Sequence, residues 1–359
     1  MTLIATVIIV ALIFEYINGF HDTANSIATV VGTKVLTPRQ AVILAAVTNL
    51  AGAMAGTAVA KTISSGIVDA QVTTITSQFL ICALIGAILW NLLTWWFGLP
   101  SSSSHALVGG LCGAALAASG NNWKSIIWSQ PDAQHWWLGK GLLWKVIVPM
   151  VVSPLAGFII GFILMAMLYL CLHNNRPQRI NRFFGVAQIF SAAGMGFMHG
   201  TNDAQKTMGI IALALVAATS AGYFDHLPSW LQFLYTPKAE IATWVKALCA
   251  LTMASGTAAG GWRIIKTLGH KMVKLHPING FAAEASSAAV IGTATLFGIP
   301  VSTTHNISAA IMGVGSAKRF NAIKWGVVER MVWAWIFTIP VSAGLAYCLV
   351  RLLQLMHVI

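Results

Sequence analysis

Charge is what this sequence lacks most. Only 8% of its 359 residues are Asp, Glu, Lys or Arg, whereas 57% are apolar. A soluble globular domain carries about 25% charged residues, so this chain has too few charged groups to cover a surface that faces water. The scarcity excludes an ordinary soluble domain and indicates that most of the surface faces another medium.

Cysteine spacings typical of disulfide frameworks or metal sites are also missing. All cysteines lie in or beside apolar stretches, and no two are spaced as CxxC. In such surroundings cysteine acts as a small apolar packing residue, so we predict no disulfides, no metal site and no bound cofactor. The five are Cys82, Cys112, Cys171, Cys249 and Cys348.

Acidic residues are rarer than basic ones, 9 against 21, which gives a formal net charge of +12. This excess does not indicate nucleic-acid binding, because the basic residues fall in short loops between apolar runs and not on one hydrophilic face. Basic loops between apolar segments are what the positive-inside rule expects of a membrane protein.

Long apolar runs are abundant, as in 79–96 and 146–172. The hydrocarbon core of a bilayer is about 30 Å thick and takes roughly 20 apolar helical residues to cross. Seven or more stretches of this kind occur. We therefore predict an all-α, polytopic protein of the inner (plasma) membrane with about 10–12 membrane segments.

Two polar motifs each occur twice, in the same order along the chain. The first reads GFHDTANS at 19–26 and GTNDAQKT at 200–207. The second reads GLPSSSSH at 98–105 and GIPVSTTH at 298–305. An ordered recurrence indicates an internal duplication. We divide the chain into a first transmembrane repeat at 1–172, a short basic connector at 173–182, and a second repeat at 183–359.

The distribution of Lys and Arg indicates that the second repeat is inverted relative to the first. If both termini lie outside, thirteen Lys and Arg are inside and seven outside, with Lys206 in the membrane. The opposite orientation reverses this bias and is disfavoured. We therefore predict two inverted repeats with both termini outside, each containing a broken first helix and a re-entrant hairpin.

The first motif places carboxylates inside apolar segments. An unbroken helix over 2–32 would be roughly 46 Å long, and the polar stretch at 18–26 predicts a break in it. A carboxylate in a bilayer costs roughly 2.5–3.5 kcal/mol on insertion scales. Because Asp22 and Asp203 occupy matched positions 181 residues apart, we predict a role in a transport pathway and not a structural cap.

The second motif predicts a re-entrant turn. Gly followed by Pro ends one helix, and Ser or Thr caps the start of the next. The free N–H groups and the dipole at a helix start favour an anion, and the hydroxyls add further donors. Two such helix starts, one per repeat, are expected to meet near the membrane midplane, where inverted-repeat transporters bind their substrates.

Carboxylates beside an anion site favour phosphate over sulfate. Protonated phosphate offers P–OH donors to an ionised Asp, which only accepts hydrogen bonds, whereas sulfate carries no proton at neutral pH. Asp22 and Asp203 are alternatively, or also, ligands of a coupling cation. A sulfate permease is the nearest alternative and an anion channel a more distant one. Matched Ser and Thr tracts fit binding better than catalysis, so no enzyme is predicted.

Several polar residues near the motifs are open to both a functional and a structural interpretation. Lys206 either has a functional role, in which it neutralises Asp203 or approaches the anion, or it snorkels to the inner face. Glu15 lies in an apolar run and is expected to help with coupling. Histidines beside the motifs either relay protons or are hydrogen-bonded residues at helix ends. The four are His21, His105, His199 and His305.

At these residues the chain resembles the PiT family of inorganic phosphate transporters, over nearly its whole length. GFHDTANS is similar to the family's GANDVANA signature, and HGTNDAQK to its second-repeat form GANDGQK. FGLPSSSSH and FGIPVSTTH resemble the family's paired hairpin tips. Where sodium-driven members have Asn, this chain has His21, which resembles the bacterial proton-coupled branch that accepts neutral metal-phosphate complexes.

The resemblance implies a set of site residues. The hairpin tips would hold the anion through Ser102, Ser103, Ser104, Ser302, Thr303 and Thr304. Asp22, Asn25, Asp203 and Gln205 would complete the substrate site. Cation coupling is assigned to Asp22, Asn25, Asn202, Asp203, His21 and Glu15.

We therefore predict a secondary transporter that imports inorganic phosphate by alternating access. The coupling ion is a proton or sodium, and a divalent metal travelling with phosphate is an open option. The predicted partners are phosphate, the lipid bilayer and, as an option, a second copy of the chain in a homodimer. Nucleic acid is not among them.

Overall fold

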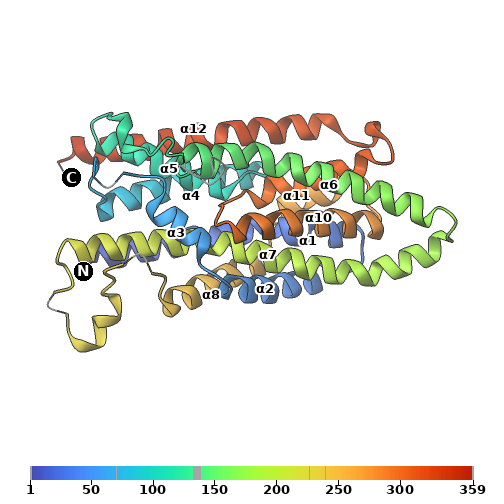
Figure 1. Cartoon of the computed structure of the whole chain (residues 1–359), viewed down its shortest axis with the longest axis horizontal. Coiled ribbons are helices and arrows are strands. Elements are labelled where there is room, and N and C mark those ends of the chain that lie inside the picture. The colour runs from blue at the N-terminus through green and yellow to red at the C-terminus, as the bar shows by residue number, and fades with distance from the viewer. Residues whose placement is uncertain (1, 70, 132–138, 226, 239, 358–359) are drawn as a thin grey trace.

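The computed structural model consists of helices that run close to one long axis (Figure 1). It describes residues 2–69, 71–131, 139–225, 227–238 and 240–357. The helices of the first half are α1 (Thr2–Gly32), α2 (Pro38–Met54), α3 (Ala58–Ser65), α4 (Ser77–Phe97), α5 (Ser103–Ala118) and α6 (Val148–Leu172). Those of the second half are α7 (Pro177–Ser220), α8 (Thr243–Ala259), α9 (Trp262–Lys266), α10 (Pro277–Leu296), α11 (Thr303–Ser316) and α12 (Trp325–Leu355).

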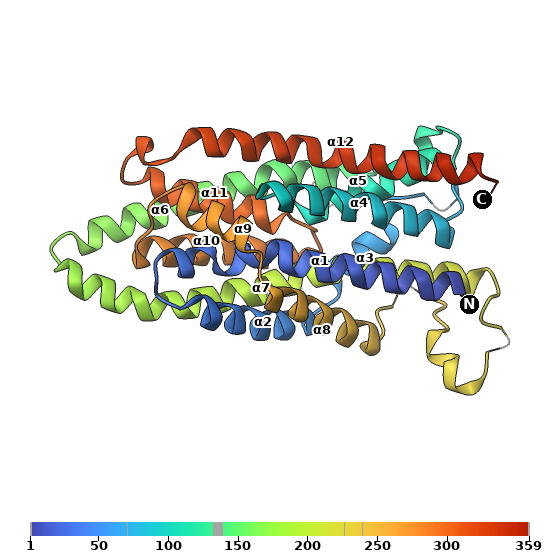
Figure 2. The same ribbon diagram turned by 180° about the vertical axis from the view of Figure 1, so that it is seen from behind.

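The predicted all-helical class is confirmed, and the order of elements repeats between the halves. In each half a long first helix is followed by a shorter helix, a helical fragment, a hairpin and a long last helix. Helix α1 starts at the end of the molecule where both termini lie, whereas α7 starts at the opposite end (Figure 1 and, from behind, Figure 2). The two long helices therefore run in opposite directions.

The predicted break in the first helix of each repeat is wrong. Both α1 and α7 are continuous α-helices through their polar motifs. The polar side chains bond to neighbouring elements or to the preceding turn, as when Thr23 Oγ1 donates to the Gly19 carbonyl at 2.6 Å. Because partners are supplied in this way, the backbone hydrogen bonds need not be given up to satisfy these groups.

A break occurs instead between α2 and α3, which are bent by 70° relative to each other. Gly56 has a φ of +82° there, a left-handed conformation that suits glycine. The first N–H groups of α3 have no partner within their own helix. Gln205 of α7 supplies one, because its Oε1 accepts from Val59 N at 2.8 Å and from Ala60 N at 3.3 Å.

The two hairpins have the predicted turn chemistry. Gly98 and Gly298 end the first helix of each hairpin with φ values of +65° and +63°. Ser102 and Ser302 cap the second helix, and each Oγ accepts from the backbone N–H three residues later at 3.2 Å. The matching geometry of the two tips follows from their matching sequences.

The hairpins pack against helices from the opposite half. Helix α5 contacts α12, and α11 contacts α6. Glycines permit the close approach: a Cβ at Gly113 would lie 2.0 Å from the Ala343 carbonyl oxygen, and one at Gly313 would lie 2.1 Å from that of Phe158. These glycines are 200 residues apart, like the hairpin tips, so the same contact is built twice. Small residues at helix crossings are typical of membrane proteins.

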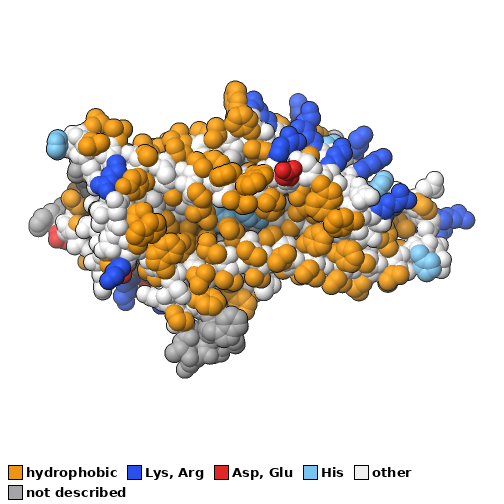
Figure 3. All heavy atoms as spheres, turned by 90° about the horizontal axis from the view of Figure 1, so that it is seen from above, with side chains coloured by type: hydrophobic (Ala, Val, Ile, Leu, Met, Phe, Trp, Pro, Cys, Tyr) orange, Lys and Arg blue, Asp and Glu red, His pale blue; other side chains and the backbone are white. Residues whose placement is uncertain are grey.

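The outer surface suits a lipid environment. Four described helical segments are long and apolar enough to cross a membrane, and the bent α2–α3 pair makes a fifth. Hydrophobic side chains cover the middle of the face in Figure 3, and most Lys and Arg on it gather toward the end with the α6–α7 connector. The predicted 10–12 membrane segments and the division at 173–182 stay predictions. The four segments are Thr2–Gly32, Ser77–Phe97, Leu143–Leu172 and Trp325–Leu355.

We expect Gly113→Leu and Gly313→Leu each to destabilise the protein by at least about 1–3 kcal/mol, the usual cost of over-packing. The added side chain would collide with the backbone of the neighbouring helix. Unfolding of the purified protein in detergent measures the effect. Gly344→Leu is the control, because a Cβ there meets nothing within 4 Å. Equal stability of all three variants would contradict this account of the hairpin packing.

Candidate functional site: a buried polar centre between two hairpin tips

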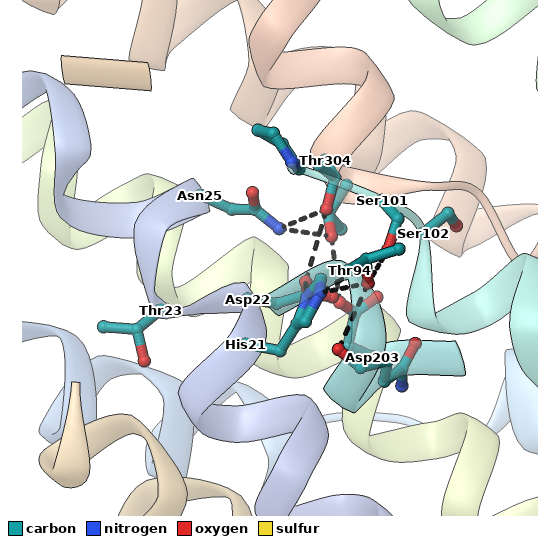
Figure 4. Close-up of polar contacts among 12 residues, drawn as sticks. His21, Asp22, Thr23, Asn25, Thr94, Ser101, Ser102, Asp203 and Thr304 are labelled. Atoms are coloured by element: carbon teal, nitrogen blue, oxygen red, sulfur yellow. Dashed lines mark hydrogen bonds and ion pairs between the residues drawn. The ribbon is translucent and has the colours of Figure 1, made fainter. Parts of the chain in front are cut away.

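Both copies of the first motif meet the hairpin tips at the centre of the molecule (Figure 4). The motif residues on α1 and α7 are buried, including both aspartates. The tips meet there too: the rings of His105 and His305 lie 4.9 Å apart between centroids. The two helix starts that were predicted to meet therefore do so, and the first motif of each half lies against them.

The start of α11 bridges the two aspartates. Thr303 Oγ1 donates to Asp203 Oδ2 at 2.9 Å, and Thr304 Oγ1 donates to Asp22 Oδ1 at 3.4 Å. Asn25 of α1 donates its amide to both threonine hydroxyls, at 3.2 and 2.9 Å. One hairpin tip thus binds the polar motifs of both halves.

Lys206 is tied to the same centre and does not snorkel. Its ammonium donates to Asp203 Oδ1 and to Ser104 Oγ, and to the Val301 carbonyl at 3.1 Å. The residue is only 2% exposed. Lys206 therefore neutralises Asp203 and joins α7 to both hairpin tips, which decides between the two interpretations of the sequence.

Residues at corresponding positions of the two halves contact corresponding hairpin residues, but they differ in charge. Asn25 and Lys206 are 181 residues apart, like the aspartates. Asn25 bonds to Thr304, and Lys206 bonds to Ser104, the residue that corresponds to Thr304 in the first hairpin. A neutral amide in one half is thus replaced by a full positive charge in the other.

Each aspartate also has a histidine beside it. His21 Nδ1 lies 2.7 Å from Asp22 Oδ1, and His199 Nε2 lies 3.0 Å from Asp203 Oδ2. The histidines stand one residue and four residues before their aspartates, and the position matched to each is asparagine in the other half. Both halves therefore place a histidine against the aspartate, but the histidine stands at a different position of the helix in each half.

The other two motif histidines pack between the hairpin tips. His305 stacks on Trp335 of α12 at 4.2 Å between ring centroids, and it also contacts His105. Trp335 in turn donates its indole N–H to the Pro100 carbonyl of the first tip at 2.9 Å. These histidines join the two tips to each other and to α12.

Three predicted site residues bond elsewhere in this structure. Gln205 caps α3. Asn202 donates to Thr295 Oγ1 at 2.8 Å and to the Ile299 carbonyl at 3.3 Å, on the stem of the second hairpin. Glu15 accepts from Thr207, one turn further along α7. All three hold helices against the centre, and none contacts an aspartate of the motifs through these bonds.

The predicted tip serines differ in what their hydroxyls bond, and Ser104 is bonded to Lys206. Ser102 and Ser302 use their side chains as helix caps. The hydroxyl of Ser103 is buried and has no hydrogen-bond partner among the described residues. A buried hydroxyl without a partner is costly, and Ser103 is the one of the predicted tip serines whose hydroxyl is left as an unused donor.

Sequence reasoning missed three residues of the centre. Thr94 and Ser101 bond to each other at 2.8 Å and lie 3.2 and 3.4 Å from His21 Nε2. Asn49 Oδ1 lies 3.1 Å from His199 Nδ1. Ser101 belongs to the SSSS tract and was within reach of the motif argument, whereas Thr94 and Asn49 sit singly on apolar helices and carry no sequence signal.

The centre combines groups that suit an anion with groups that suit a cation. Hydroxyls, an amide and an ammonium donate hydrogen bonds, whereas the aspartates only accept. One ligand atom each from Asp22, His199 and Asp203 lie within 4.8 Å of one another, close enough to ligate one cation. A buried charged centre inside lipid-facing helices defines a membrane transporter, because charges at such depth mark ion and substrate pathways.

Comparison with known proteins identifies the family. The model of the phosphate transporter family matches residues 18–179 and 170–346. The chain therefore belongs to the phosphate transporter family, as its motifs predicted, and this is a family of transporters and not of enzymes.

Relatives and a solved structure agree with this assignment. A Bacillus subtilis (strain 168) protein named "Probable low-affinity inorganic phosphate transporter" is 45% identical, over 96% of this chain and 95% of its own length. A Rhizobium meliloti (strain 1021) protein of the same name is 44% identical, over 95% and 93%. The solved structure titled "The sodium-dependent phosphate transporter" has the same fold, with a TM-score of 0.83 and 24% identity over 99% of this chain and 100% of that chain.

We expect Lys206→Met to destabilise the protein by about 3–5 kcal/mol, because it leaves the Asp203 carboxylate buried without its counter-charge. The double variant Asp203→Asn with Lys206→Met should recover most of that loss, since no unpaired charge remains. Unfolding in detergent gives the coupling between the two positions. The exposed Lys124→Met is the control, and additive effects of the two substitutions would refute the pairing.

Proposed function

We propose that this protein imports inorganic phosphate across the bacterial plasma membrane as a secondary active transporter. Family membership and the names of the bacterial relatives support phosphate as the cargo. The observation that carries the proposal is the bridging of both aspartates by the hydroxyls of one hairpin tip. This arrangement offers donors and acceptors within one buried centre.

Phosphate matches this mixture better than sulfate. The oxygens of a tetrahedral anion would accept from the hydroxyls, from Asn25 and from Lys206, in place of the contacts that these groups now make within the centre. The P–OH groups of protonated phosphate would donate to Asp22 and Asp203, whereas sulfate has no donor for them at neutral pH. A sulfate permease is therefore the weaker alternative.

Coupling to protons is supported by the histidine beside each aspartate. Histidine is the side chain whose charge changes most readily near neutral pH, and imidazole is a poor ligand for sodium compared with oxygen. Asp203 has Lys206 as a permanent counter-charge, whereas no Lys or Arg among the described residues pairs with Asp22. We therefore assign the coupling proton to Asp22 and His21, with sodium, or a divalent metal carried with phosphate, as the alternatives.

Alternating access requires the hairpin tips to separate from the long helices. The centre is buried from both sides in this structure, so either side opens only when bonds such as Asn25 to Thr304 are exchanged for bonds to substrate. Both termini lie at the end opposite the α6–α7 connector (Figure 1). Because the basic connectors favour the inner side, we place both termini outside.

Arsenate in large molar excess should inhibit uptake of labelled phosphate into proteoliposomes, whereas an equal excess of sulfate should not. Arsenate is tetrahedral and carries protons at neutral pH, as phosphate does, so it can donate to both aspartates. Potassium chloride at matched ionic strength is the control. Inhibition by sulfate as strong as that by arsenate would favour the sulfate permease instead.

An inward proton gradient should drive phosphate accumulation, and Asp22→Asn or Asp203→Asn should abolish it. Asparagine keeps the size of the side chain but cannot hold the coupling charge. Uptake is measured in proteoliposomes with proton and sodium gradients imposed separately. Asp225→Asn, at an exposed position outside the centre, controls for the loss of one carboxylate. Accumulation driven by sodium alone would reject the assignment to protons, and normal uptake by both motif variants would reject the site.

A further inference from the structure

A second polar cavity lies far from the hairpin tips, at the base of the second hairpin. It has a volume of about 330 Å³ and is lined where α10 begins and α11 ends. Lys274, Lys318 and Arg319 line it, together with His276, and no Asp or Glu is among its lining residues. The cavity is therefore strongly cationic.

The positive charges of this cavity are not neutralised by the protein. Lys274, Lys318 and Arg319 are exposed, and within the described part of the chain their side chains have no hydrogen bond or ion pair. Three unpaired cations around one concave surface favour an anionic ligand, since their fields add within it.

An apolar groove continues from this cavity. It has a volume of about 310 Å³ and runs between the end of α6 and the start of α7, along Leu168, Leu172 and Ile180. The cavity and the groove share Tyr169 and Lys318 among their lining residues, so they form one continuous depression. One part of it suits a negative charge, and the other suits hydrocarbon.

This depression lies where a lipid headgroup would meet the protein. The apolar segment Leu143–Leu172 ends at the groove, and its last turns expose large side chains, with Leu170 74% exposed. The cationic part lies just beyond this apolar surface, as expected at the boundary between hydrocarbon and headgroups.

We propose that this depression binds an anionic phospholipid, with its phosphate group in the cationic cavity and one acyl chain in the groove. Basic pockets between membrane helices are suited to anionic headgroups, and the attached groove favours a lipid over free phosphate. A lipid bound there contacts both ends of the second hairpin, α10 at its start and α11 at its end. This inference does not depend on the proposed function.

Lipid retention tests the proposal. The full-length protein, purified from mixed vesicles of phosphatidylglycerol and phosphatidylcholine, should retain phosphatidylglycerol preferentially in native mass spectrometry. Lys318→Gln with Arg319→Gln should lower this preference about tenfold, because each basic side chain contributes to attraction of anionic lipid. Lys34→Gln with Arg39→Gln removes the same charge from exposed positions in the α1–α2 connector and at the start of α2 and should leave the preference unchanged.

Two further arms distinguish a lipid from a free anion. Leu168→Trp, which narrows the groove and keeps every charge, should also reduce retention of phosphatidylglycerol. Added inorganic phosphate should not displace the retained lipid. The proposal is overturned if phosphate displaces it, if Leu168→Trp has no effect, or if both double variants lower the preference equally.

Discussion

The buried carboxylates of Asp22 and Asp203 need hydrogen-bond or charge partners, and the rest of the structure supplies them. In a protein surrounded by hydrocarbon, a polar group without a partner is costly, and a charge is more so. The fold meets this demand with the start of α11, whose threonines donate to both aspartates, and with a histidine on each aspartate's own helix. Asp22 accepts from a threonine of the second half, and Lys206 donates to a serine of the first, so both halves contribute to the centre.

The two halves are symmetric in position but not in charge. Lys206 replaces a neutral amide, and the histidines occupy different turns of their helices. As a result Asp203 is paired with a fixed cation, whereas Asp22 is paired with no Lys or Arg in the segments that the structure describes. A duplicated frame thus supplies two similar positions, and single substitutions give them different charges.

Much of the fold and part of the centre could be predicted from the sequence. Apolar runs, repeated motifs and helix caps at Ser102 and Ser302 depend on local chemistry, which a sequence records directly. The continuity of α1, the contacts of Gln205 and the contribution of Thr94 depend on which helices meet in space. A polar run breaks a membrane helix only when no neighbouring helix supplies hydrogen-bond partners to its side chains. The sequence does not show which helices are neighbours in space.

The paired glycines have a mechanical consequence. Because Gly113 locks α5 to α12 and Gly313 locks α11 to α6, each hairpin is attached to the last helix of the other half. The units that pack most closely therefore do not coincide with the two copies of the repeat. Each combines a hairpin of one half with the last helix of the other, so to separate such a unit from the rest of its repeat would require the chain to bend within that repeat.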